Sequence, residues 1–195
     1  MKNSILTILA ITALVACKKK ETVVVNTNAD STNMSMPMDS TTMSSNSSNT
    51  AMLPNQDKMF ADAAAKGGMM EVMLGNIAET NASNQKVKDF GKMMVSDHSK
   101  ANDELKSWAM NANYNLPTSL DADQQKMVDN LKMKMGADFD KAYTDLMVND
   151  HKKVIEAFKK EAMNGTGSLK TFASNTVPAL EIHLTKAEDA MKAVK

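Results

Sequence analysis

The sequence lacks most of what disulfide-bonded and nucleic-acid-binding proteins depend on. Its 195 residues include one cysteine, which excludes a disulfide within the chain, and no arginine, so every basic residue is a lysine. Without arginine, the bidentate guanidinium contact to phosphates and carboxylates is missing. Basic and acidic residues balance at 23 each, whereas nucleic-acid-binding proteins usually carry a basic excess. We therefore expect no nucleic-acid partner.

Residues that favour strands and turns are also scarce. Aromatic residues make up 4% of the chain, and there are 7 glycines and 4 prolines against 19 methionines. Alanine, methionine, lysine, glutamate and leucine favour helices, and runs of the β-branched residues that favour strands are almost absent. The composition predicts an all-α protein, and the length predicts one domain with a tail.

The first residues have the pattern of a lipoprotein signal peptide. Lys2 precedes an apolar segment, residues 5–16, that is too short to remain as a membrane-spanning helix. Residues 14–17, Leu-Val-Ala-Cys, resemble the lipobox of bacterial lipoproteins. This resemblance implies that residues 1–16 are removed and that Cys17 carries lipid, which makes the membrane a partner of the chain. The alternative is an ordinary signal peptide with a chance cysteine.

The lysines at 18–20 bear on the cellular location. Lysines directly after the cysteine resemble those of lipoproteins sorted to the outer membrane, and they attract anionic headgroups. We therefore expect a lipid-anchored protein of the cell envelope, located at the outer membrane and facing the periplasm.

Residues 17–54 form a low-complexity segment rich in serine, threonine, asparagine and methionine. Such a segment buries too little apolar surface to offset its ordering entropy, so we expect a disordered tether. Met34, Met36 and Met38 are closely spaced within it. Thioethers suit Cu(I), and the pattern resembles the methionine motifs of periplasmic copper proteins. The alternative is compositional drift without metal binding.

Five later segments have the three-and-four spacing of apolar residues that is typical of amphipathic helices. We expect long helices at about 55–81, 83–111, 137–163 and 168–195, and a short helix at about 121–135. The short connections make the first and last pairs antiparallel hairpins. Residues 55–195 are therefore predicted to form an antiparallel four-helix bundle, with the short extra helix between the second and third long helices.

Glycines mark special positions in this pattern. Gly67 and Gly68 lie in the middle of the first long helix, where they predict a close helix contact or a kink. The segment Asn-Gly-Thr-Gly at 164–167 predicts a left-handed C-cap at the end of the third long helix. Pro178 lies inside the fourth long helix and predicts a kink there.

A short motif occurs twice, in the middle of the second and third long helices. Residues 94–100 and 147–153 both read Met-Val-x-Asp-His-x-Lys. The motif predicts that the bundle contains an internal repeat in which these two helices correspond.

Four polar residues interrupt the apolar stripes, one on each long helix: Glu71, His98, His151 and His183. Each has apolar or small neighbours three and four residues away on the same face, so each is predicted to point inward near the middle of its helix. Inward side chains of facing helices build the metal sites of helix bundles. Three imidazoles and one carboxylate suit zinc, copper, iron or manganese. The alternative is a metal-free polar layer of hydrogen-bonded core residues that fixes the helix register.

Two aspartates directly precede histidines of this layer. Asp97 and Asp150 each have a lysine three residues later, so a surface ion pair is one interpretation. In the other, each carboxylate reaches a neighbouring helix and orients a histidine there. Glu104 follows Asp97 by seven residues and is predicted to border the same seam.

Several segments together resemble a bacterial family of unknown function, often described as putative outer-membrane proteins. They are residues 60–61, 67–75, 87–102, 139–143, 150–151 and 180–184. The resemblance covers about residues 56–192 and implies a ferritin-like four-helix bundle and an envelope location, but no reaction. Di-iron proteins of that fold use Glu-x-x-His pairs. Because Val95, Val148 and Leu180 stand at the glutamate positions, a mononuclear site or none is expected.

Three functions remain open at this point. The first is a lipid-anchored protein that binds or buffers a transition metal. The second is a non-enzymatic structural or stress-related envelope protein. The third is a redox enzyme, which requires an open coordination position and a cavity beside the metal. We assign no catalytic residue, and enzymatic activity is the less expected outcome.

Overall fold

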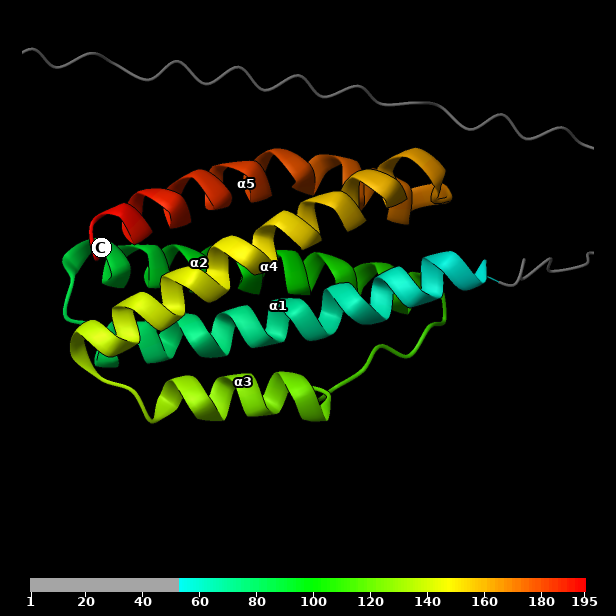
Figure 1. Ribbon diagram of the computed structural model, residues 1–195. Helices are drawn as coiled ribbons and strands as arrows, with labels where there is room; N and C mark the ends of the chain where they lie inside the picture. Colours follow the sequence, from blue (N-terminus) through cyan, green and yellow to red (C-terminus); the bar gives the residue numbers. More distant parts are fainter. Residues whose placement is uncertain (1–52) are drawn as a thin grey trace, which may run out of the picture. The chain divides into compact units, whose positions relative to one another are not determined.

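The computed structural model describes residues 53–195, and all regular secondary structure in this part of the chain is α-helical. Its helices are α1 (Asn55–Asn81), α2 (Gln85–Asn111), α3 (Ala122–Lys132), α4 (Gly136–Asn164) and α5 (Gly167–Lys192) (Figure 1). The all-α prediction is confirmed, with four long helices and one short helix close to the expected positions. None of these five helices is long and apolar enough to cross a membrane. Cys17 and the tether methionines lie outside the described residues.

The four long helices pack as two hairpins (Figure 1). The closest packing is between α1 and α2 and between α4 and α5, while contacts of α2 with α5 and of α1 with α4 join the hairpins. The connection from α2 to α4 returns along the bundle through α3, which lies against α1. As a result, α2 and α4 run in the same direction, and every pair of neighbouring long helices is antiparallel.

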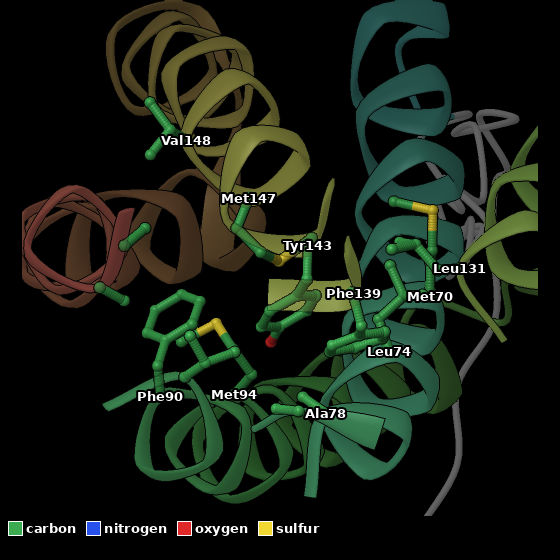
Figure 2. Packing of buried hydrophobic residues seen from close by; sticks show 14 of the residues in the cluster. Met70, Leu74, Ala78, Phe90, Met94, Leu131, Phe139, Tyr143, Met147 and Val148 are labelled. Carbon is green, nitrogen blue, oxygen red and sulfur yellow. The ribbon is translucent and has the colours of Figure 1, made fainter. Parts of the chain in front are cut away.

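The core has two apolar clusters, one toward each end of the bundle. In the first cluster, Phe139 and Tyr143 of α4 reach between α1 and α2 and stack on each other (Figure 2). The second contains Phe60, Trp108 and Phe158, with Phe60 and Phe158 packed edge to face. Along each long helix, the residue of the predicted polar layer stands between buried residues of one cluster and buried residues of the other. The polar layer therefore lies between the two clusters.

Two glycines allow α1 and α2 to approach closely. A Cβ atom on Gly75 would lie 2.6 Å from the carbonyl oxygen of Gly91, so both positions require glycine. The predicted close contact at the glycine pair of α1 is confirmed for Gly68, which packs against the Asn102 side chain. Gly67 differs, because a Cβ atom there would meet nothing within 4 Å among the described residues.

The predicted left-handed cap at the end of α4 is wrong. Gly165 is the C-cap residue, but its φ of −69° is extended backbone, and its N–H donates to the Glu161 carbonyl. The left-handed residue is Gly167, with a φ of 52°, at the first position of α5. Asp121 with Gln124 three residues later is the sequence pattern of a capping box, and both of its hydrogen bonds are present at the start of α3.

Each hairpin turn is bound by a carboxylate from the first turns of the other hairpin. Asp140 of α4 accepts hydrogen bonds from the backbone N–H groups of Ser83 and Asn84, between α1 and α2. Asp57 of α1 accepts from the backbone N–H and the hydroxyl of Thr166, between α4 and α5. These bonds satisfy backbone donors that would otherwise be exposed at the helix starts.

These two carboxylates belong to a second short pattern that occurs twice in the chain. Residues 57–62 and 140–145 both read Asp-Lys-x-aromatic-x-Asp, and they begin α1 and α4, the first helices of the two hairpins. The Met-Val-x-Asp-His-x-Lys motif instead lies on α2 and α4, which are the second helix of one hairpin and the first of the other. The internal repeat predicted from this motif would relate the two parallel helices, α2 and α4, and it stays a prediction.

Candidate metal centre

The four predicted layer residues come together in the interior, one from each long helix. The exposed fractions are 2% for Glu71, 6% for His98, 0% for His151 and 2% for His183. The spacing explains this burial, because Met94, Met147 and Leu180, one turn earlier on the same faces, are also buried. The sequence-based assignment of the inward face therefore agrees with the structure for all four residues.

One nitrogen of each imidazole ring is held by a hydrogen bond. His98 donates from Nδ1 to Oε2 of Glu71, and His183 donates from Nε2 to Oδ2 of Asp97, both at 2.9 Å. His151 donates from Nδ1 to the carbonyl oxygen of Met147, also at 2.9 Å. These are the partners that orient metal-bound histidines in proteins, namely carboxylates and a backbone carbonyl. Each bond fixes both the orientation of a ring and which nitrogen keeps its lone pair.

The opposite nitrogens of the three rings are buried without a partner. Among the described residues, His98 Nε2, His151 Nε2 and His183 Nδ1 have no hydrogen-bond partner. The three histidines each offer one ligand nitrogen, and these atoms lie within 4.8 Å of one another. Two nitrogens bound to a tetrahedral ion at about 2 Å would lie about 3.3 Å apart, so small side-chain rotations would complete the site.

Glu71 lies beside this histidine cluster rather than within it. Its Oε2 accepts the hydrogen bond from His98, and its Oε1 is 3.6 Å from Nε2 of His151. Within residues 53–195, Oε1 has no hydrogen-bond partner. The geometry therefore makes Glu71 a positioning residue for His98, with one oxygen left free near the cluster.

Burial and the carboxylate together set the charges. Burial alone would raise the pKa of Glu71, but the charge and hydrogen bond of His98, with the charges of His151 and His183, lower it below its ordinary value. Burial lowers the pKa of His98 less than Glu71 raises it, so the net shift is upward. For His151 and His183, burial is the largest effect and lowers the pKa. These two rings are therefore neutral at pH 7 and can act as metal ligands.

Asp97 reaches from α2 to α5. It is 46% exposed, and its carboxylate accepts the hydrogen bond from His183 across the seam between these helices. This geometry matches the interpretation in which an aspartate orients a histidine on a neighbouring helix. In the surface-pair interpretation, its partner would instead be Lys100 on its own helix.

Comparison with known families gives a match over most of the chain. The model described as "Domain of unknown function (DUF4142)" matches residues 42–190. The chain belongs to the DUF4142 family. No curated protein and no solved structure matches it. Because the family description names no activity, the function has to be argued from the site of this DUF4142 member itself.

The other two predicted positioning residues make different contacts in this DUF4142 domain. Asp150 is half-buried, and its Oδ2 has no hydrogen-bond partner within the described helices. Burial, followed by repulsion from Glu71, raises its pKa to about 6. Glu104 is exposed and lines a groove between α2 and α5. Neither residue holds a histidine, unlike Asp97.

This groove connects the surface to the histidines. It has a volume of about 280 Å³, and Asp97, Glu104, His98 and His183 are among its lining residues. Its two carboxylates outnumber the one lysine of the lining, Lys100, so the groove would attract a cation. The groove therefore offers a polar route by which an ion reaches the cluster.

Sequence reasoning did not single out Tyr143 as a residue near the candidate site. It is fully buried eight residues before His151, on the same face of α4, and its hydroxyl has no hydrogen-bond partner in the part of the chain that the structure describes. Burial, and then the charge of Glu71, raises its pKa. The spacing of eight residues, about two helical turns, was the available signal, but aromatic residues on such a stripe usually belong to the core.

Proposed function

We propose that this protein is a lipid-anchored envelope protein that binds or buffers one transition-metal ion in a ferritin-like four-helix bundle. His98, His151 and His183 supply the ligand nitrogens, while Glu71 and Asp97 hold two of the rings. The observation that carries this proposal is the cluster of three buried histidines: each has one ring nitrogen without a hydrogen-bond partner in residues 53–195, and each has a ring nitrogen within 4.8 Å of the other two.

The energetic argument starts from those three nitrogens. A buried polar atom without a partner costs roughly 1–3 kcal/mol, so three at one level are expensive unless something binds them together. One cation would satisfy all three at once. The opposite nitrogens of the rings already have fixed partners, so the rings lose little further freedom on binding.

The donor set indicates which ions fit. Three imidazoles suit zinc, copper, iron or manganese, and a three-histidine site leaves a coordination position open in tetrahedral geometry. The long connection through α3, which makes α2 and α4 parallel, supports the ferritin-like type of bundle, because such folds have one long crossover. The Glu-x-x-His pairs of di-iron proteins are missing from the helices that carry the histidines, which supports a mononuclear site.

The location rests on the first residues of the chain. The lipobox-like segment at 14–17 supports lipid attachment at Cys17, and the following lysines support the outer membrane, facing the periplasm. A protein there would meet metal ions before they enter the cytoplasm. Met34, Met36 and Met38 would add Cu(I) ligands near the anchor.

Metal analysis tests the proposal directly. The protein would be purified without chelator, and its metal content measured by mass spectrometry before and after loading with each of the four ions. We expect close to one ion per chain in the wild type, and none in the His98→Ala/His151→Ala double variant. A matched control, Asn149→Ala/Lys153→Ala, changes two exposed residues of α4 and should keep the ion. Equal metal content in the wild type and the histidine variant would contradict the proposal.

The competing function is a structural envelope protein with a metal-free polar layer. The observation that favours it is the buried pair of Glu71 and His98, which satisfies two polar groups without an ion. Such a layer would fix the helix register. It predicts the same melting temperature with and without a chelator, whereas metal binding predicts a decrease on chelation.

A further inference from the structure

A cavity lies in the interior of the bundle directly beside the candidate metal centre. All four long helices line it, and Glu71 and His98 form part of its wall. The rest of the wall is mostly apolar, with Leu105, Phe158 and Leu180 among its residues. Its volume is about 80 Å³.

The volume limits what the cavity can hold. An apolar cavity of about 150 Å³ accommodates benzene, which has six carbon atoms, so about 80 Å³ accommodates a molecule of roughly two to four non-hydrogen atoms. Aromatic rings, sugars and amino acids are too large. The cavity nevertheless exceeds the space that one water molecule needs.

The chemistry of the wall limits the ligand further. The Thr176 hydroxyl in the wall already donates to the Phe172 carbonyl at 2.7 Å, so it is not free to bind a ligand. The cavity lining contains no lysine, and the ionised carboxylate of Glu71 in its wall would repel an anion. A charged molecule would lose its hydration without compensation, whereas an uncharged molecule would not. The free polar atoms of Glu71 and His98 are located at the metal-centre side of the cavity.

Part of the cavity wall reaches the surface at a different seam from the polar groove, although the cavity and the groove share His98, Ala101, Thr176 and Leu180. Ala63 and Ala157 are exposed, Gly67 and Val154 are partly exposed, and all four line the cavity. They belong to α1 and α4, whereas the groove with Asp97 and Glu104 lies between α2 and α5. Small side chains, and the missing side chain of Gly67, keep the α1–α4 seam open.

We propose that this cavity binds a small uncharged molecule and presents it to the coordination position that three histidines leave open on a bound ion. The inference rests on the proposed function, because it needs an ion at His98, His151 and His183. It goes beyond that function by assigning the class of ligand and by naming one entry route for the ion and one for the ligand. Ions would enter along the carboxylate-lined α2–α5 groove, and the uncharged ligand through the apolar α1–α4 seam.

Xenon under pressure tests the cavity in the metal-free protein, by xenon NMR or by anomalous scattering from crystals. We expect one xenon site in the wild type. Gly67→Leu should remove it, because a side chain at this position enters open space and replaces a helical glycine, which favours folding. Ala157→Leu provides a second filling variant from α4. Asn76→Leu adds the same side chain on the exposed face of α1, away from the cavity, and should retain xenon.

Nitric oxide tests the link to the ion. The protein would be loaded with Fe(II), its iron content measured, and nitric oxide titrated with detection by electron paramagnetic resonance. We expect Gly67→Leu to bind the same amount of iron but to weaken nitric oxide binding by about tenfold or more, equivalent to about 1.4 kcal/mol. Asn76→Leu should match the wild type.

The outcomes separate the two proposals. Absence of xenon from the wild type, or equal nitric oxide affinity in wild type and Gly67→Leu at equal iron content, would overturn the cavity proposal. Absence of all four ions from the loaded wild type would overturn the proposed function instead, and with it the link between cavity and ion.

Discussion

Replacing Asp97 separates metal binding from folding more cleanly than replacing a histidine. Asp97 fixes the His183 ring through a 2.9 Å hydrogen bond, yet it is 46% exposed. Loss of a carboxylate that orients a ligand typically weakens metal binding about 10- to 100-fold, which is about 1.4–2.7 kcal/mol. Because His183 is neutral at pH 7, its contact with Asp97 is a hydrogen bond, and such a bond contributes about 0.5–1.5 kcal/mol to folding. The metal affinity should therefore fall more than the stability of the metal-free protein.

The size of the effect should depend on what replaces the carboxylate. Asp97→Asn keeps an oxygen that accepts from His183 and loses only the charge, so we expect a loss near tenfold. Asp97→Ala removes the acceptor as well, so we expect a loss near 100-fold. Asp103→Asn is the matched control, because Asp103 lies on the same helix in an exposed pair with Lys106 and should leave the affinity unchanged.

Competition with a chromophoric chelator gives the metal affinity, and thermal unfolding of the metal-free protein gives the stability. The reasoning is refuted if Asp97→Ala binds metal as tightly as Asp103→Asn. It is also refuted if Asp97→Ala lowers the free energy of unfolding of the metal-free protein by as much as it lowers the free energy of metal binding. Asp97 would then act through the fold.

Three further predictions concern the ion, the helix contact and pH. Chelation should lower the melting temperature of the wild type and leave that of His98→Ala/His151→Ala unchanged. If the free ion had been at 100 times its Kd, the wild type should lose about 2.7 kcal/mol of stability on chelation. Gly75→Ala should cost about 1–3 kcal/mol in urea unfolding, because its Cβ would meet the Gly91 carbonyl; no loss would contradict the close approach. Burial raises the pKa of Glu161 in the folded state more than its hydrogen bond from Gln56 lowers it, and the nearby Asp57 raises it further. Its stabilising contribution is present below the unfolded pKa of about 4.5 and is lost as pH rises through the folded pKa, so Glu161→Gln should be the more stable protein at pH 7, with a difference that shrinks toward pH 4.

The inward face of each helix could be predicted from the sequence because it depends on one helix alone. At about 100° per residue, the apolar neighbours of His98, His151 and His183 determine the direction of each side chain. The same argument correctly predicted that Glu71 is buried. Helix existence and the capping box of α3 followed from local patterns in the same way.

Relations between helices could not be predicted with the same argument. The partner of Asp97 is on α5, and its position depends on how α2 and α5 pack, which no spacing within one helix encodes. The different roles of Gly67 and Gly68 also depend on a neighbouring helix, since only Gly68 faces Asn102. For the same reason, the sequence could indicate four polar residues but not which nitrogen of each ring would remain free.

The two carboxylates that bind the hairpin turns have a consequence for assembly of the domain. Asp57 holds the turn at Thr166, and Asp140 holds the turn at Ser83, so each hairpin supplies the cap that its counterpart needs. A hairpin on its own would lose these bonds to carboxylates and would satisfy the donors of its turn only with water. Neither half is therefore self-sufficient, and the two halves would acquire their final structure, and bring the three histidines together, in one concerted step.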